Sequence, residues 1–223
     1  MIMPRVLTRP AERRITEDWR TEIPSLGVYK LRWLLRRVGP LLVGVCLDRD
    51  SSGESYMPTF HVHFLGMAFP GVSLLLSTQL CSERSGGPDF VQVRFHADKY
   101  KEAAARMVRQ SLLPLQGDLR LAQVVHAYRQ YLVTPVGKVQ AAILFRDIAI
   151  LSALAGDRWG ALALLAECLR LPDTAGFRHV GGREVLEADC RRLIGSPTLI
   201  QQTVDSQLAA LGVGGLPSSN LLR

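Results

Sequence analysis

His61-Val62-His63 is the stretch of this sequence whose residue types are most typical of catalysis or metal binding. Alternate residues of a β-strand point to the same side, so a strand here would present two imidazoles on one face. Imidazole transfers protons near neutral pH and is a common metal ligand. A metal needs further ligands, and the nearby carboxylates belong to the preceding loop, residues 48 to 54. His96, at the end of another expected strand, would join the site if it lay on the same face. Histidines also occupy sheet faces without a chemical role, so both interpretations stay open.

Motifs of other chemistries are absent from the sequence. It contains no nucleophile elbow, no P-loop and no GxGxxG. Cys46, Cys81, Cys168 and Cys190 are far apart, without the paired spacing of a zinc site. We therefore expect no metal, no cofactor and a reducing compartment. A non-enzymatic protein is the leading interpretation.

Basic side chains form a second pattern in the stretch from residue 29 to 37. If this stretch is a strand, Lys30, Arg32 and Arg36 share one face, while Tyr29 and Trp33 share the other. Cations beside aromatic rings are typical of single-strand nucleic-acid binding, but here they would lie on opposite faces. A third surface is the loop from residue 173 to 182. The residues expected to contact a partner are Lys30, Arg32, Arg36, His61, His63, Phe177, Arg178 and His179.

Apolar patterns along the chain predict strands first and helices second. Alternation with period two from residue 27 to 36 favours a strand, with a helix as the alternative for so Leu- and Arg-rich a run. Turn residues separate further strand candidates at residues 41 to 47, 56 to 65, 72 to 80 and 90 to 95. The short loops indicate a five-stranded, mainly antiparallel sheet whose apolar face needs a cover of helices.

Helical periodicity begins near residue 98. Helices are predicted at residues 98 to 111, 118 to 132, 145 to 155, 159 to 171, 183 to 194 and 197 to 211. The densest apolar segment runs from Phe145 to Pro172 and is hinged at Gly156-Asp157. Glycine accepts the left-handed backbone of a helix end, and aspartate caps the next helix. These two helices should form an antiparallel hairpin.

Small and large residues of this hairpin fall close to the positions of a repeat pattern: Ala149, Gly156, Ala161, Leu165 and Pro172. The hairpin therefore resembles a single tetratricopeptide repeat. Cys168 stands where that pattern wants a smaller residue, and no second copy appears at the expected period. Such repeats need about three neighbours to bury their faces, so an ordinary helical hairpin is the favoured interpretation and a relic of a repeat is the alternative.

The predicted fold class is α+β: an N-terminal, mainly antiparallel five-stranded sheet followed by a C-terminal helical bundle with one TPR-like hairpin. The expected parts are a lead-in segment (1 to 26), a sheet subdomain (27 to 96), a helical subdomain (97 to 212) and a tail (213 to 223). The lead-in mixes arginines, prolines and acidic residues. We expect it to be mobile or loosely docked, with a short helix near residues 10 to 19.

Composition sets limits on the compartment and on the partners. The 223 residues, 48% of them hydrophobic, are enough to bury a substantial core. The basic N-terminus lacks the apolar core of a signal peptide, and no apolar run approaches the roughly 18 residues of a membrane span. A cytoplasmic location follows as an expectation. The net charge of +7 comes mainly from dispersed arginines, which is weaker support for nucleic-acid binding than a cluster.

These observations favour a protein-interaction module over an enzyme. The narrower hypothesis is a cytoplasmic bacterial protein of the immunity or antitoxin type. Such a protein binds and neutralises or positions a partner protein, for example a toxin. It rests on an analogy of size and on the lack of catalytic motifs. A basic nucleic-acid-binding protein is the alternative, and a histidine-dependent, metal-assisted hydrolase comes third. The sequence leaves the partner and the oligomeric state undetermined.

Overall fold

The computed structural model describes residues 6 to 223 and divides them into two compact units. The sheet unit comprises the residues up to His63, Ser73–Asp118 and Gly215–Asn220. The helical unit comprises Phe64–Val72, Leu119–Gly214 and Leu221–Arg223. An antiparallel sheet near the N-terminus followed by helices confirms the α+β class.

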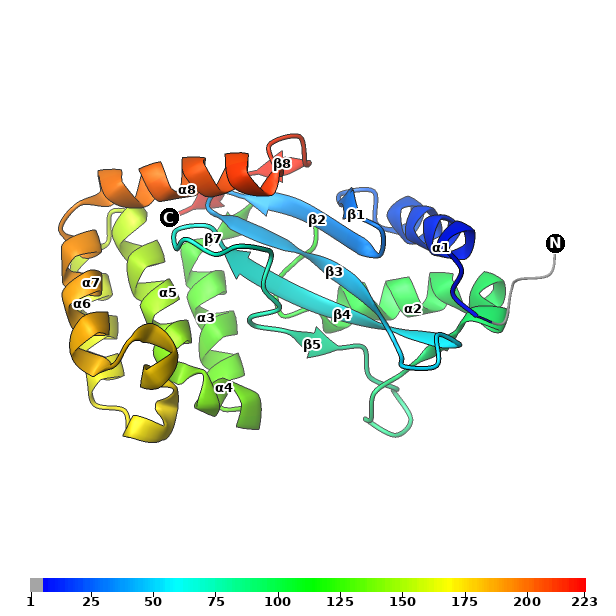
Figure 1. Ribbon diagram of the computed structural model, residues 1–223, viewed down its shortest axis with the longest axis horizontal. Coiled ribbons are helices and arrows are strands. Elements are labelled where there is room, and N and C mark those ends of the chain that lie inside the picture. Colours follow the sequence, from blue (N-terminus) through cyan, green and yellow to red (C-terminus); the bar gives the residue numbers. More distant parts are fainter. Residues whose placement is uncertain (1–5) are drawn as a thin grey trace. The chain divides into compact units, whose positions relative to one another are not determined.

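Five strands in the order β1-β2-β3-β4-β5 form the centre of the sheet unit (Figure 1). They are Gly27–Lys30 (β1), Trp33–Val38 (β2), Leu41–Arg49 (β3), Ser55–Phe64 (β4) and Thr78–Gln79 (β5). A short strand, Val91–Gln92 (β6), pairs antiparallel with the start of β4. The first seven residues of β3 are buried because that run is continuously apolar.

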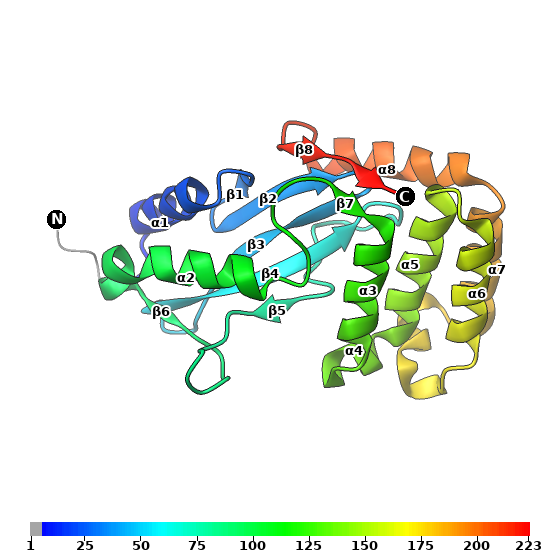
Figure 2. The same ribbon diagram turned by 180° about the vertical axis from the view of Figure 1, so that it is seen from behind.

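Two helices cover one face of this sheet (Figure 2). They are Arg9–Glu22 (α1) and His96–Gln110 (α2). Thr8 caps α1, and the side chains of Ile15 and Trp19 are completely buried. The expected short helix is therefore present, but the expectation of loose docking is wrong from residue 9 onward. Residues 1 to 5 of the lead-in lie outside the described residues.

The predicted strand from residue 27 to 36 is in fact two strands, β1 and β2, joined by a tight turn. Arg32 takes a left-handed backbone there, with φ of 68°. Its amide donates to Thr16 Oγ1 of α1 at 3.0 Å, and its guanidinium contacts Glu12 at 3.1 Å. Non-glycine residues rarely adopt this conformation, so the helix contacts stabilise a turn that the alternating pattern concealed.

Two other strand predictions were too long. From residue 72 to 80 only β5 is a strand. The Ser73 amide instead donates to His63 Nδ1 at 3.2 Å, and the Leu75 carbonyl accepts from the Val62 amide at 3.1 Å. From residue 90 to 95 only β6 is a strand, because residues Val93–Phe95 turn as a 3-10 helix directly into α2.

The helical unit is built around one buried helix, α5. Its helices are Leu121–Leu132 (α3), Pro135–Val139 (α4), Ala141–Leu154 (α5), Arg158–Leu169 (α6), Arg183–Ile194 (α7) and Pro197–Leu211 (α8). The hairpin of α5 and α6 is confirmed: Gly156 has a φ of 87°, and Asp157 accepts the Gly160 amide at 2.8 Å. The short helix α4 and the 3-10 helices Asp173–Ala175 (η2) and Phe177–Val180 (η3) lie where loops were expected.

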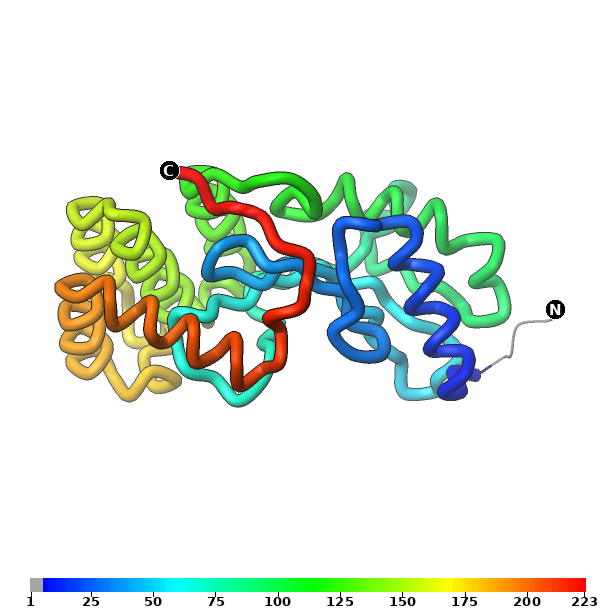
Figure 3. The backbone as a smooth tube through the Cα atoms, turned by 90° about the horizontal axis from the view of Figure 1, so that it is seen from above, coloured from blue at the N-terminus to red at the C-terminus, as the bar shows by residue number. Residues whose placement is uncertain are grey.

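The tail continues from α8 and is drawn in red in Figure 3. Ser218–Ser219 (β8) pairs in parallel with β2, which makes it part of the sheet unit. Leu221–Leu222 (β9) pairs in parallel with Leu119–Arg120 (β7) in the helical unit. The last residues are thus structural strands. Across residues 6 to 223, no helix has the length and apolar character needed to cross a membrane.

Candidate functional site

His61 and His63 lie together on β4, and both are buried. The His61 ring meets the Trp33 ring edge-on at 5.1 Å, and neither of its nitrogens has a hydrogen-bond partner. His63 Nδ1 lies 2.9 Å from the Ser73 hydroxyl. Burial lowers the pKa of His61 to about 3 and that of His63 to about 4, so both rings are neutral at physiological pH.

His96 does not join these two histidines. Its Nδ1 lies 2.7 Å from the hydroxyl of Tyr56, and its Nε2 lies 3.0 Å from Asp18 Oδ2. Tyr56 is separated from His61 by five positions on β4, and alternation places their side chains on opposite faces. Across residues 6 to 223, no three His, Cys, Asp or Glu side chains converge as metal ligands. The His61-His63 pair therefore gains no third ligand of this kind.

The hydrogen bonds around His96 join α1, β4 and α2. Trp19 Nε1 donates to the Tyr56 hydroxyl at 3.0 Å. Burial lowers the pKa of His96, against the opposing effect of Asp18. A neutral ring with its proton on Nε2 donates to Asp18 and accepts the Tyr56 proton on Nδ1. Every member of this network then has a hydrogen-bond partner. The network therefore helps to hold α1 and α2 on the sheet.

The predicted basic strip is divided between buried and exposed residues. Arg36 is buried, and its guanidinium donates to the carbonyls of Pro114 (2.8 Å) and Gly117 (2.6 Å) and to the Ser219 hydroxyl (2.9 Å). Arg32 is committed to α1. Lys30 is exposed, with its ammonium 4.8 Å from the centre of the Tyr29 ring. The strip that alternation suggested is therefore not a continuous cationic surface.

The loop residues Phe177, Arg178 and His179 are likewise separated. Phe177 is buried beneath the Arg183 guanidinium, 4.1 Å from its ring centre. Arg183 also donates to the carbonyl of Leu171 at 2.8 Å. Arg178 and His179 are exposed. Phe177 therefore supports the end of α6, and only its two neighbours are accessible to a partner.

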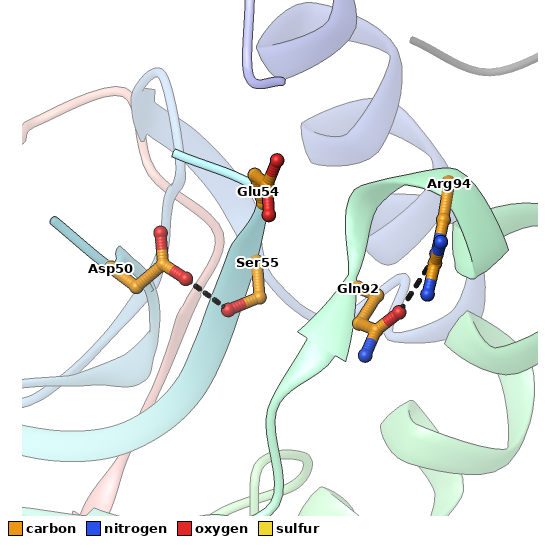
Figure 4. Close-up of a pocket in the computed structure, with 5 residues that line it drawn as sticks. All are labelled: Asp50, Glu54, Ser55, Gln92 and Arg94. Carbon is orange, nitrogen blue, oxygen red and sulfur yellow. Dashed lines mark hydrogen bonds between the residues drawn. The ribbon is translucent and has the colours of Figure 1, made fainter. Parts of the chain in front are cut away.

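A polar hollow lies where the β3–β4 turn approaches β6 (Figure 4). Its volume is about 310 Å³, and Asp50, Glu54, Ser55, Gln92 and Arg94 line it. Asp50 accepts the Ser55 hydroxyl and the Gly53 amide, and Arg94 donates to Gln92 Oε1 at 2.9 Å. The hydrogen bonds that Asp50 accepts close the turn and lower the pKa of its carboxyl, with the Ser55 hydroxyl bond as the main cause. The Asp50 carboxylate therefore stabilises the β3–β4 turn.

An apolar groove occurs in the helical unit beside α4. Its volume is about 420 Å³. The residues that line it come from α3, α4, α5, the end of α6 and η2: Arg129, Leu132, Val133, Lys138, Ala141, Phe145, Glu167, Leu171, Pro172, Thr174 and Ala175. The groove is open to solvent. Val133, which lines the groove, is 71% exposed, and two further valines, Val136 and Val139 of α4, are 54% and 53% exposed.

Charged side chains border this groove. Arg129 donates to both carboxylate oxygens of Glu167, at 3.1 and 2.8 Å, which bridges α3 and α6. Lys138 is exposed and forms no ion pair with any described residue. The groove thus has an apolar floor, one ion pair between Arg129 and Glu167, and the unpaired ammonium of Lys138 among its described residues. Together the residues that line this groove are called the α4 groove below.

Sequence reasoning missed the α4 groove, although a signal was present. Three valines recur every three residues across Thr134-Pro135, a helix-start pattern with Pro in the first turn. This stretch reads as a linker because Pro135 and Gly137 are turn residues. The exposure of the valines was not predictable, since a period of three also describes a buried helix face.

Comparison with known protein families, with curated proteins and with solved structures finds no match for this chain.

Proposed function

We propose that this chain is a non-enzymatic protein-interaction module that binds an apolar segment of a partner protein in the α4 groove. The observation that carries the proposal is a groove with an apolar floor whose lining residue Val133 is 71% exposed, with two further exposed valines on α4. An exposed apolar groove on a folded protein commonly marks an interaction site. Covering a valine completely contributes about 1.5 kcal/mol or more, so this surface favours a partner.

The charges suggest the chemistry of the partner segment. The Arg129-Glu167 pair is already satisfied, so the uncommitted cation is Lys138. A bulky apolar side chain in the groove, followed by a carboxylate close to Lys138, would complement both features. Such a segment resembles the amphipathic peptides that bind hydrophobic grooves between helices.

In the narrower hypothesis, this chain is a bacterial immunity or antitoxin-type protein, and the segment belongs to the protein that it neutralises or positions. In that version the partner is a toxin whose activity is blocked on binding. The hydrolase alternative gains no support from the geometry, because His61 and His63 are both buried.

The test is a pull-down with the tagged full-length chain, with and without nuclease and at two salt concentrations. Val133→Asp should abolish recovery of the partner because it places a carboxylate in the lining of the groove. Val185→Asp is the matched control, since it changes a valine on α7 that is 49% exposed and outside the groove. Equal recovery with both variants would refute the α4 groove as the binding site. Recovery that disappears with nuclease would replace the protein partner by nucleic acid.

A further inference from the structure

A second hollow, in the sheet unit, combines exposed aromatic rings with cations. It lies between β6 and α2 and has a volume of about 260 Å³. Phe90, Gln92, Phe95 and Lys99 are among the residues that line it, and we call it the Phe90 hollow. Phe90 and Phe95 are 48% and 46% exposed. Large aromatic side chains usually bury their rings, so two exposed ones at a single hollow indicate a ligand that covers them.

Some charged residues of the Phe90 hollow form ion pairs and others do not. Its two carboxylates, Asp89 and Glu102, both pair with the largely buried Arg106. Lys99 is exposed and forms no ion pair within the described part of the chain. The hollow therefore keeps an available ammonium beside its rings.

Arg94 is a second cation next to the hollow. Its guanidinium lies 4.6 Å from the centre of the Phe95 ring, and its Nε donates to Gln92 Oε1 at 2.9 Å. Gln92 lines both this hollow and the polar hollow of Figure 4. With its oxygen engaged, the Gln92 amide nitrogen is the donor left for a ligand.

We propose that the Phe90 hollow binds one nucleotide of a single-stranded nucleic acid. The base stacks on the Phe90 ring, the Gln92 amide nitrogen donates to an edge of the base, and Lys99 and Arg94 face the phosphates. Aromatic stacking beside cations is how single strands are held with little sequence preference. The volume, just below the usual range of small-molecule pockets, suits one base and no larger ligand. The bases of a duplex are stacked in pairs and are not available to the ring. This site is independent of the α4 groove, which belongs to the other unit.

The test is fluorescence anisotropy of a labelled oligouridine 12-mer with the full-length protein at several salt concentrations. We expect binding that weakens with salt, a loss of about fivefold or more in affinity for Phe90→Ala, and a salt slope reduced by about 1 for Lys99→Ala. Trp159→Ala and Lys138→Ala are the controls, because they remove an exposed aromatic ring and an exposed cation in the helical unit. Thermal melts confirm that each variant is folded.

Three outcomes would overturn the proposal. The first is that the wild-type chain does not bind the 12-mer, or binds the matching duplex as tightly. The second is that folded Phe90→Ala binds like the wild type, or that Trp159→Ala weakens binding as much. The third is that uridine monophosphate competes at the concentration at which the 12-mer binds, since the ligand would then be a free nucleotide. None of these results bears on recovery of a protein through the α4 groove.

Discussion

The buried histidines differ in what surrounds them. His61 contacts an aromatic ring and lacks a hydrogen-bond partner, whereas His96 has Tyr56 on one nitrogen and Asp18 on the other. A buried imidazole without a partner resists protonation because its charged form cannot be solvated. The surroundings of His61 therefore connect the stability of the sheet unit to pH.

We expect the protein to lose stability as the pH falls below about 6.5. The unfolded chain takes up protons on its histidines there, while folded His61 and His63, with pKa values of about 3 and about 4, do not. Between pH 7.5 and 5.5 these two residues together should cost about 2 to 3 kcal/mol of the free energy of unfolding. Urea titrations at several pH values measure this loss.

His61→Leu separates this effect from the general effect of acid. It should remove about half of the histidine contribution and leave stability at pH 7.5 unchanged or higher, because no hydrogen bond of His61 is lost. Substitution of the exposed His126 by Gln controls for the loss of a histidine. An unaltered pH dependence in His61→Leu would contradict the explanation.

The Tyr56 hydroxyl joins two partners, so its removal has a predictable cost. Tyr56→Phe leaves Trp19 Nε1 and His96 Nδ1 without their hydrogen bonds inside the protein. We expect a loss of about 1 to 3 kcal/mol in the free energy of unfolding at pH 7.5, measured with urea. A double variant with His96→Gln should be less destabilised than the sum of the two single variants, because they share one hydrogen bond. Strict additivity would show that the contact is not energetically significant.

Elements whose cause is local were predicted from the sequence. The hairpin of α5 and α6 follows from a glycine and a capping aspartate that are adjacent in the chain, and β3 follows from one apolar run. The elements that were mispredicted depend on distant residues. The turn at Arg32 needs Thr16 of α1, and the chain after residue 72 is held by His63. Alternation cannot report such contacts.

The helix α4 offers a test at this scale, because its glycine is tightly enclosed. A Cβ on Gly137 would lie 2.0 Å from the Tyr131 carbonyl oxygen, whereas one on Gly214 would meet nothing within 4 Å. Gly137→Ala should therefore lower the melting temperature, with a cost of about 1 to 3 kcal/mol from overpacking. Gly214→Ala, the matched control, should be neutral or slightly stabilising. Equal melting temperatures would mean that α4 shifts without cost, and the valines beside it would not be held in place.

At the scale of the whole molecule, the chain order conceals how the units are composed. The sequence predicts contiguous parts, with a sheet to residue 96 and helices from 97, because composition changes there. Each compact unit instead consists of three separate stretches, and the sheet unit includes Gly215–Asn220 from the end of the chain. The pairing of β8 with β2 is a contact across the length of the sequence. A two-residue strand carries no periodicity from which such a contact could be inferred.

Removal of the tail should therefore damage the sheet unit, although the cut comes after the last helix. A chain that ends at Gly214 loses the Pro217 and Ser219 carbonyls, which accept from the Arg37 and Gly39 amides at 2.8 and 3.1 Å. It also loses the Ser219 hydroxyl beside the buried Arg36 guanidinium. We expect a loss of about 2 kcal/mol or more in the free energy of unfolding and faster hydrogen exchange at the Arg37 and Gly39 amides. The control is Ser218→Ala, which alters an exposed side chain and keeps the backbone pairing. Unchanged exchange at both amides in the shortened chain would show that the tail is dispensable to the sheet and that Arg36 is satisfied by the carbonyls of Pro114 and Gly117 alone.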